Sequence, residues 1–222
     1  MKYNIISTGS HGNAVVLNDT ILIDCGVPLK ALNDVYKGLQ IVLLTHEHGD
    51  HLNTRTVRNL ARERPTLRFA CCEWLVPNLL ACDVPKRNID VLEIGKLYDY
   101  KAFQVSPIKL YHNVPQCGWR VFCGGEKAIY ATDTEHLRGI TAKGYDLYLI
   151  EANYTEDDLQ RRIDTKLDAG DFCYELNVAN RHLSKEQADE FLLANMGEKS
   201  EFAFLHGHVD RTEKGGDWDY AE

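Results

Sequence analysis

Short apolar runs separated by turn residues open the chain. Three runs rich in β-branched residues, at 3–7, 14–17 and 21–23, are divided by turns that contain Gly, Asn and Asp. Such runs are typical of neighbouring antiparallel strands, so this region is predicted to form a β-meander. The fully apolar run at 41–44 predicts a further strand, which would be buried.

Apolar residues at helical spacing occupy the segments between and after these strands. The spacing predicts three helices, over 28–36, 53–64 and 72–80. For the second of these, Asn53 is the expected N-cap and Pro65 the expected stop. Helices that alternate with strands indicate α/β layering.

Strand patterns return in the second half of the chain. Runs of β-forming residues predict strands at 103–105, 108–111, 119–122, 128–130, 147–150 and 202–205. Ser184 and Gln187 match an S-x-x-Q capping box, and apolar residues at helical spacing follow it. A helix is therefore predicted over 185–195.

The two strand-rich halves, each followed by helices, predict the architecture. The expected fold is an α/β helix–sheet–sheet–helix (αββα) sandwich. A chain of 222 residues is long enough for one well-buried domain and too short for two large ones. We expect a single domain over 1–208, followed by a polar tail over 209–222.

The composition disfavours several classes of protein and several kinds of binding partner. With 25 basic and 33 acidic side chains the net charge is −8, which disfavours binding of nucleic acid by bulk charge and leaves only local basic patches. No apolar stretch approaches the ~18 residues of a membrane span, and the N-terminus lacks the apolar core of a signal peptide. The seven cysteines are odd in number and contain no C-x-x-C, which predicts reduced thiols and a cytoplasmic protein with no membrane partner.

A dense group of potential metal ligands follows the apolar run at 41–44. The segment 45–51 reads Thr-His-Glu-His-Gly-Asp-His and offers four such ligands within six residues. On an extended strand end, residues i and i+2 point the same way, so His46 and His48 are expected to bind one ion. Asp50 and His51, on the following turn, are expected to face a neighbouring ion.

Three further candidate ligands follow strands elsewhere in the chain. His112 comes after the run at 108–111, Asp133 after 128–130 and His206 after 202–205. A carboxylate such as that of Asp133 has two oxygens and can bridge two ions. Their common place at strand ends predicts that they meet the first group.

Several segments together resemble the metallo-β-lactamase superfamily, and within it the phosphodiesterase branch. The opening segment 7–14 and the strand end 23–26 are similar to the G-S-x-G-N-A turn and the D-x-G strand end of small bacterial DNA exonucleases of the YycJ type. The segment 148–153 resembles the E-A-N/T motif that these nucleases share with the tRNA 3′-processing endonucleases. The segment 181–184 resembles their G-H-L-S motif, with Arg181 in place of the usual glycine.

The resemblance implies two divalent metal ions, Zn or Mn, with a divided ligand set. One ion would take His46, His48 and His112, the other Asp50, His51 and His206, and Asp133 would bridge them. His208 competes with His206 for the last position. Asp24 would orient a ligand imidazole, or else serve only to form a turn. His11 and Glu47 are expected at the rim of the site or in solvent.

The expected reaction is attack of an activated water on a phosphodiester, with Asp50, His182 and Glu151 taking part. His182 precedes a predicted helix N-terminus and is the candidate acid that protonates the leaving alcohol. Glu151 would hold its imidazole in a useful tautomer. Arg181 either alters this loop or adds a phosphate contact.

The resemblance therefore implies a hydrolase, most similar to DNA exonucleases, with a nucleic acid or a small nucleotide as partner. Cleavage of a cyclic nucleotide, as by some phage-encoded members, fits the acidic charge. A thioester or lactam hydrolase has the same metal motif, and an inactive scaffold would be expected to have lost ligands. Arg55, Arg58 and Arg62 form either a basic stripe at the site mouth or a solvated helix face. A homodimer is suggested by family analogy.

Overall fold

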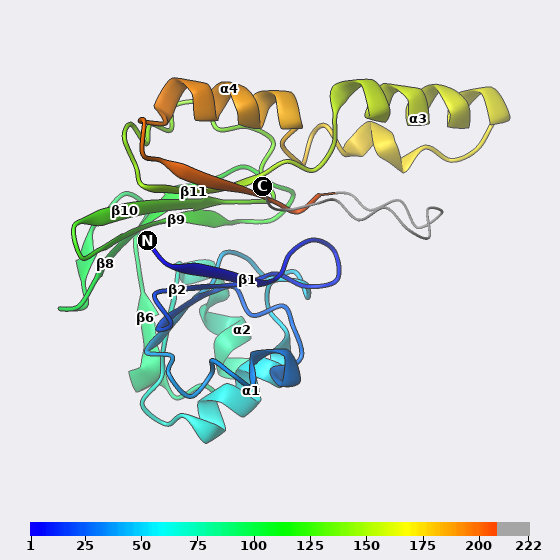
Figure 1. Cartoon of the computed structure of the whole chain (residues 1–222). Helices are drawn as coiled ribbons and strands as arrows, with labels where there is room; N and C mark the ends of the chain where they lie inside the picture. The colour runs from blue at the N-terminus through cyan, green and yellow to red at the C-terminus, as the bar shows by residue number, and fades with distance from the viewer. Residues whose placement is uncertain (208–222) are drawn as a thin grey trace.

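A computed structural model describes residues 1–207, and these form two stacked β-sheets covered by helices on their outer faces (Figure 1). This is the predicted αββα sandwich. The prediction is confirmed for the described residues, whereas His208 and the expected tail over 209–222 lie outside them. Within 1–207, no helix combines the length and the apolar character that a membrane crossing requires.

The first sheet has six strands in chain order. The antiparallel part is the predicted meander, and parallel strands follow it. Its members are β1 (Tyr3–Ser7), β2 (Ala14–Leu17), β3 (Ile21–Ile23), β4 (Ile41–Leu43), β5 (Arg68–Cys71) and β6 (Ile89–Val91). Strands β5 and β6 were not predicted.

The second sheet also has six strands, in reverse chain order from one edge to the other. Strands β7, β8, β9 and β10 pair in antiparallel fashion, each with the next, and β10, β11 and β12 pair in parallel. Its members are β7 (Tyr98–Asp99), β8 (Gln104–Lys109), β9 (Cys117–Cys123), β10 (Glu126–Ala131), β11 (Leu147–Glu151) and β12 (Glu201–Leu205). The two runs predicted at 103–105 and 108–111 belong largely to the single strand β8.

Helices cover the outer face of each sheet. On the first sheet lie α1 (Thr54–Glu63) and α2 (Val76–Ala81), and on the second lies α4 (Lys185–Asn195). The side chain of Asn53 accepts a hydrogen bond from the Thr56 amide, and the capping box of α4 is formed in full. The bounds predicted for α4 are confirmed.

Two helical predictions are corrected. The segment 28–36 contains only the short 3₁₀ helix η1 (Leu29–Leu32), because apolar residues spaced by three suit a 3₁₀ turn, in which i and i+3 lie above one another. The segment 72–80 is divided between the 3₁₀ helix η2 (Glu73–Leu75) and α2. Two further 3₁₀ helices are η3 (Lys86–Asn88) and η4 (Tyr174–Asn177).

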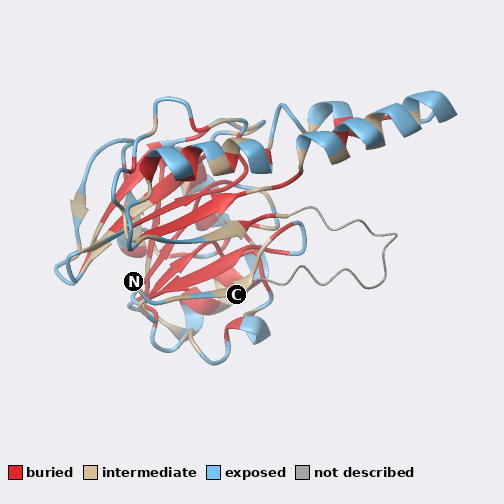
Figure 2. Cartoon of the chain, turned by 45° about the horizontal axis from the view of Figure 1, so that its top comes forward, coloured by how far each residue is buried: buried red, intermediate tan, exposed pale blue. Residues whose placement is uncertain are grey.

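The longest helix, α3 (Glu156–Ala169), was not predicted. It projects beyond the sandwich, and only Leu159 along it is buried (Figure 2). Its ends nevertheless carry ordinary signals: Thr155 caps the first turn, and Gly170 takes a left-handed conformation at the last. Its apolar row consists only of Leu159, Ile163 and Leu167, one residue per turn, which is narrower than the stripe of a packed helix, and Leu167 is 56% exposed.

Three apolar layers hold the sandwich together. One fills the space between the sheets and includes Trp119 and Tyr130, and the other two lie between each sheet and its helices. The central strands β2, β3, β4 and β11 are buried on both faces, which is why they read as continuous apolar runs (Figure 2). All seven cysteines are unpaired, and six of them are buried.

Gly26, which follows β3, lies directly against the backbone of the segment 45–51. A β-carbon at this position would lie 1.7 Å from the Asp50 carbonyl oxygen, whereas at Gly49, in the same loop, it would meet nothing within 4 Å. The amide of Gly26 also donates to the Asn13 carbonyl at 2.9 Å. A side chain at position 26 would therefore push Asp50 and its neighbours away.

We expect Gly26→Ala to lower the free energy of unfolding by about 3 kcal/mol or more, because the added methyl group overlaps backbone atoms. Gly49→Ala, the matched control, should change it by less than about 0.5 kcal/mol. Chemical denaturation monitored by circular dichroism measures both. Equal stability of the two variants would contradict this account of the Gly26 contact.

Candidate metal centre

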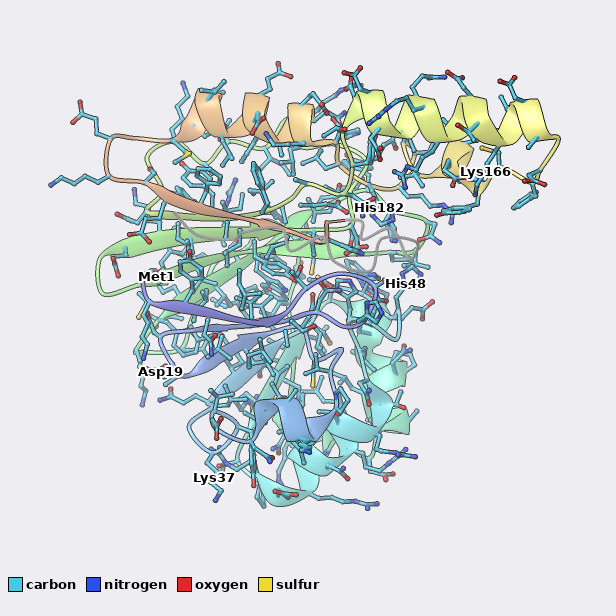
Figure 3. The ribbon with its side chains drawn as sticks, turned by 45° about the vertical axis from the view of Figure 1, so that its right-hand side comes forward. Met1, Asp19, Lys37, His48, Lys166 and His182 are labelled. Atoms are coloured by element: carbon cyan, nitrogen blue, oxygen red, sulfur yellow. The ribbon has the colours of Figure 1, made fainter. Side chains whose placement is uncertain are left out.

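The candidate ligands gather where strands of both sheets end. His46 follows β4, Asp133 follows β10, Glu151 ends β11 and His206 follows β12. Parallel strands bring their carboxyl ends to one edge, and the two sheets place these edges together. His48 and His182, from opposite halves of the sandwich, lie on the same side of the molecule (Figure 3).

His46, His48 and His112 form the first group. The His46 Nε2 and His48 Nδ1 atoms lie 3.1 Å apart. The ring of His112 has its centre 5.4 Å from that of His46 and 5.2 Å from that of His48. One ring nitrogen from each residue lies within 4.8 Å of the others, so three nitrogen ligands could share one ion.

Asp133 is the centre of the second group. Its Oδ2 atom lies 2.9 Å from His51 Nε2 and 3.0 Å from His206 Nδ1. Asp50 is at the open side, with its Oδ2 atom 3.7 Å from His51 Nε2. Since His46, His51 and Asp133 also approach one another within 4.8 Å, the two groups are contiguous through Asp133.

The backbone is left-handed at three residues of this region. Asp24, Asp133 and His206 have φ of 58°, 56° and 55°. This conformation is uncommon for residues other than glycine and persists where surrounding contacts over-determine it. For His206, the amide donates to Thr8 Oγ1 at 2.7 Å and the carbonyl accepts from Asn153 Nδ2 at 2.8 Å.

Asp24 is fully buried and orients His51. Its Oδ2 atom lies 2.7 Å from His51 Nδ1 and accepts from the Tyr130 hydroxyl at 3.1 Å. Its Oδ1 atom accepts from the amide and the hydroxyl of Thr45 at 3.0 and 2.9 Å. These contacts favour the role of orienting an imidazole over that of a simple turn residue.

The donor set fits a metal centre, because several candidate ligands have one ring nitrogen engaged away from it. His46 Nδ1 lies 3.0 Å from Thr45 Oγ1, and His112 Nδ1 lies 3.0 Å from the Arg181 carbonyl. Together with the contact of His51 to Asp24, this leaves Nε2 of all three imidazoles directed inward. Such partners fix the tautomer and the orientation of metal-binding histidines.

Burial and charge set the protonation of the cluster. Burial lowers the pKa of His46 strongly and that of His112 to about 4, so both imidazoles are neutral near pH 7. Burial opposes ionisation of Asp133, but His206 and His51 hold the pKa of its carboxyl well below the usual range. The same carboxylate, with Asp24 beside His51, raises the pKa of His51 well above its usual range and also raises that of His206. His46 and His112 are therefore ready to bind metal as neutral imidazoles, whereas His51 and His206 would release a proton on doing so.

Glu151 and His182 form a pair beside Asp133. His182 Nδ1 lies 2.7 Å from Glu151 Oε1 and 3.6 Å from Asp133 Oδ1. Glu151 is fully buried, and its Oε2 atom accepts from the amides of Thr134 and Leu183 at 2.9 and 3.2 Å. A carboxylate fixed in this way holds the imidazole of His182 in one orientation.

The structure brings the described candidate residues into one region, but Asp50 stays outside the groups whose ligand atoms lie within 4.8 Å of one another, and Glu151 and His182 join Asp133 and His206 in one such group. His208 lies outside the described residues, while His11 and Glu47 are exposed. Of the two readings of the arginine row, the contacts favour the solvated helix face. Arg58 and Arg62 share the single carboxylate of Asp83, and Arg55 stays exposed.

Two buried amides beside the centre were not assigned a role from the sequence. Asn13 Nδ2 lies 2.8 Å from His51 Nε2 and donates to the Asp50 carbonyl at 3.2 Å. Gln116 Nε2 donates to the Asp133 carbonyl. The G-x-x-G-N pattern at 9–13 was a usable signal for Asn13, but the contact of Gln116 is formed only in the folded chain.

Replacing Asp24 by asparagine should weaken metal binding by about 10- to 100-fold, because the imidazole of His51 loses its carboxylate partner. Asparagine keeps the size of the side chain and tolerates the left-handed backbone. Metal content after dialysis against a buffered chelator measures the effect, and circular dichroism checks the fold. Asp19→Asn, at an exposed position, is the control; wild-type affinity in a folded Asp24→Asn protein would refute the role.

The chain matches proteins of known sequence and structure along most of its length. It is 25% identical over 232 aligned positions to a protein named exodeoxyribonuclease WalJ from Streptococcus pneumoniae, covering 95% of this chain and 82% of that protein. The fold is shared with YhfI, a metallo-β-lactamase fold protein from Bacillus subtilis, at 17% identity and a TM-score of 0.71 over 93% of this chain and 86% of that one. Human tRNase Z, short form, has a TM-score of 0.68 at 16% identity, over 94% and 93% of the two chains.

These similarities confirm the resemblance inferred from the sequence motifs. The fold of two mixed six-stranded sheets is that of the metallo-β-lactamases. A family model described as the β-lactamase superfamily domain matches residues 19–200, which contain every candidate site residue between Asp24 and His182. The chain belongs to the β-lactamase superfamily.

Proposed function

We propose that this protein is a metal-dependent phosphodiesterase that degrades nucleic acid, and more specifically a DNA exonuclease. The observation that carries the proposal is the pair of Glu151 and His182 placed against Asp133, within a cluster of eight residues that could hold metal. The similarity to a protein named as an exodeoxyribonuclease supports the choice of DNA. Human tRNase Z, a fold neighbour, is also named as a nuclease.

The proposed ligand sets follow the two groups of the centre. His46, His48 and His112 would hold one divalent ion. Asp50, His51 and His206 would hold a second, with the carboxylate of Asp133 shared between them. Zn or Mn suits imidazole and carboxylate donors. The chemistry that such ions supply is a water with its pKa lowered toward neutrality, together with compensation of phosphate charge.

The residues around the ligands would complete the reaction. When a phosphodiester is cleaved, the leaving alcohol must gain a proton, and His182 is partly accessible beside Asp133. Glu151 would position it through the 2.7 Å contact to Nδ1, which leaves Nε2 for the leaving oxygen. A thioester or lactam hydrolase has less evident use for this pair.

The proposal is tested by turnover of metal-loaded protein on several phosphodiesters. We expect degradation of labelled DNA from an end and hydrolysis of bis-p-nitrophenyl phosphate. His48→Ala should abolish both, because it removes one of three nitrogen ligands. Hydrolysis of cyclic mononucleotides alone, or of RNA alone, would refute the DNA assignment, and inactivity on every phosphodiester with metal bound would refute the phosphodiesterase.

His182→Ala should lower turnover of DNA by about 100- to 10,000-fold while leaving the metal content unchanged. The loss should be much smaller on bis-p-nitrophenyl phosphate, because p-nitrophenolate leaves without needing a proton. Steady-state kinetics on both substrates measure the difference. His136→Ala, at a histidine outside the cluster, is the control, and an equal loss on both substrates would exclude His182 as the acid.

A further inference from the structure

Arg181 occupies a tight turn that spans the candidate centre. Its amide and that of His182 both donate to the Val178 carbonyl at 2.9 Å. The Arg181 carbonyl accepts from His112 Nδ1 at 3.0 Å, on the side of the first group of ligands. The next residue, His182, faces Asp133 in the second group. The backbone of Arg181 is thereby fixed between the two groups.

The side chain of Arg181 is exposed at this fixed position. Within residues 1–207, ion pairs are formed by other arginines, namely Arg58, Arg62, Arg68, Arg161 and Arg162. Arg181 is absent from these pairs. In a chain of net charge −8, a guanidinium that forms no ion pair within residues 1–207, on a residue whose backbone adjoins the centre, is a local attraction for an anion.

We infer that Arg181 binds the phosphate next to the cleaved one, on the side of the leaving group. This inference rests on the proposed function and adds to it the class of substrate. His182 is the residue that would protonate the leaving oxygen, and the long side chain of its neighbour Arg181 would therefore reach a phosphate on the leaving-group side. Arginine binds phosphate through paired N–H donors. Arg55 is also exposed, but it follows the metal motif and does not adjoin the proton donor.

The preferred substrate is therefore one whose leaving group carries a further phosphate, as a polynucleotide does. A cyclic mononucleotide and bis-p-nitrophenyl phosphate lack that group. Arg181 would thus distinguish polymers from small phosphodiesters without contributing bulk positive charge.

The test compares metal-loaded wild-type protein with Arg181→Ala and Arg181→Lys. The substrates are bis-p-nitrophenyl phosphate and short DNA oligonucleotides, each with one neutral methylphosphonate next to the cleaved bond, placed on either side in separate molecules. For wild-type protein, the methylphosphonate on the leaving-group side should lower kcat/KM by about 10-fold.

Arg181→Ala should lower kcat/KM on the all-phosphate oligonucleotide, and this loss should exceed its loss on bis-p-nitrophenyl phosphate by about 10-fold. For Arg181→Ala, kcat/KM should also change little when the methylphosphonate replaces the phosphate on the leaving-group side. The slope of its log KM against log salt concentration should be shallower than that of wild-type protein by about 0.7. Arg181→Lys should restore part of the loss, because it keeps the charge.

Arg87→Ala is the control, since Arg87 is exposed in η3, before β6 and thus away from the carboxyl ends of the strands. It should match wild type on all substrates. The inference would be overturned if Arg181→Ala reduced turnover of all substrates equally, or if it still distinguished phosphate from methylphosphonate. Failure of the proposed function is a different result, in which wild-type protein leaves the oligonucleotides intact.

Discussion

The buried carboxylate of Asp133 is the group on which the rest of the centre depends. It lies about equally far from His51, which belongs to the first sheet's loops, and from His206, which follows the last strand of the second. A carboxylate removed from water needs charged or hydrogen-bonding partners, and displacement of one sheet relative to the other would take His51 away and leave only partners from its own sheet, such as His206 and Thr132. The contact of Asp133 with His51 thus joins the two halves of the sandwich at the place where the proposed ligands meet.

Local strain accompanies this arrangement. Three residues at strand ends, Asp24, Asp133 and His206, adopt left-handed backbone conformations, each at a cost of about 1–3 kcal/mol. Each is held by specific partners: buried donors around the Asp24 carboxylate, the Gln116 amide on the Asp133 carbonyl, and side chains on both backbone groups of His206. Strands that end abruptly can thereby turn their last side chains toward a common point.

The acidic composition and a phosphodiester substrate are compatible because charge acts locally at the centre. Two arginines that the sequence placed near the site neutralise Asp83 instead. Recognition of phosphate would then depend on the metal ligands and on a small number of fixed cations, which suits an enzyme that acts at a chain end more than one that covers a long stretch of nucleic acid.

The sequence by itself determined the two-layer architecture, the ligand cluster after β4 and the exact bounds of α4, because continuous apolar runs, a compact motif and a capping box are local signals. It did not identify α3, whose apolar row is only one residue wide and largely exposed, and it predicted a longer helix where η1 forms. Only the tertiary structure decided which nitrogen of each imidazole faces inward and which carboxylates orient His51 and His182. Those contacts join residues 27 and 31 positions apart, and no local periodicity encodes them.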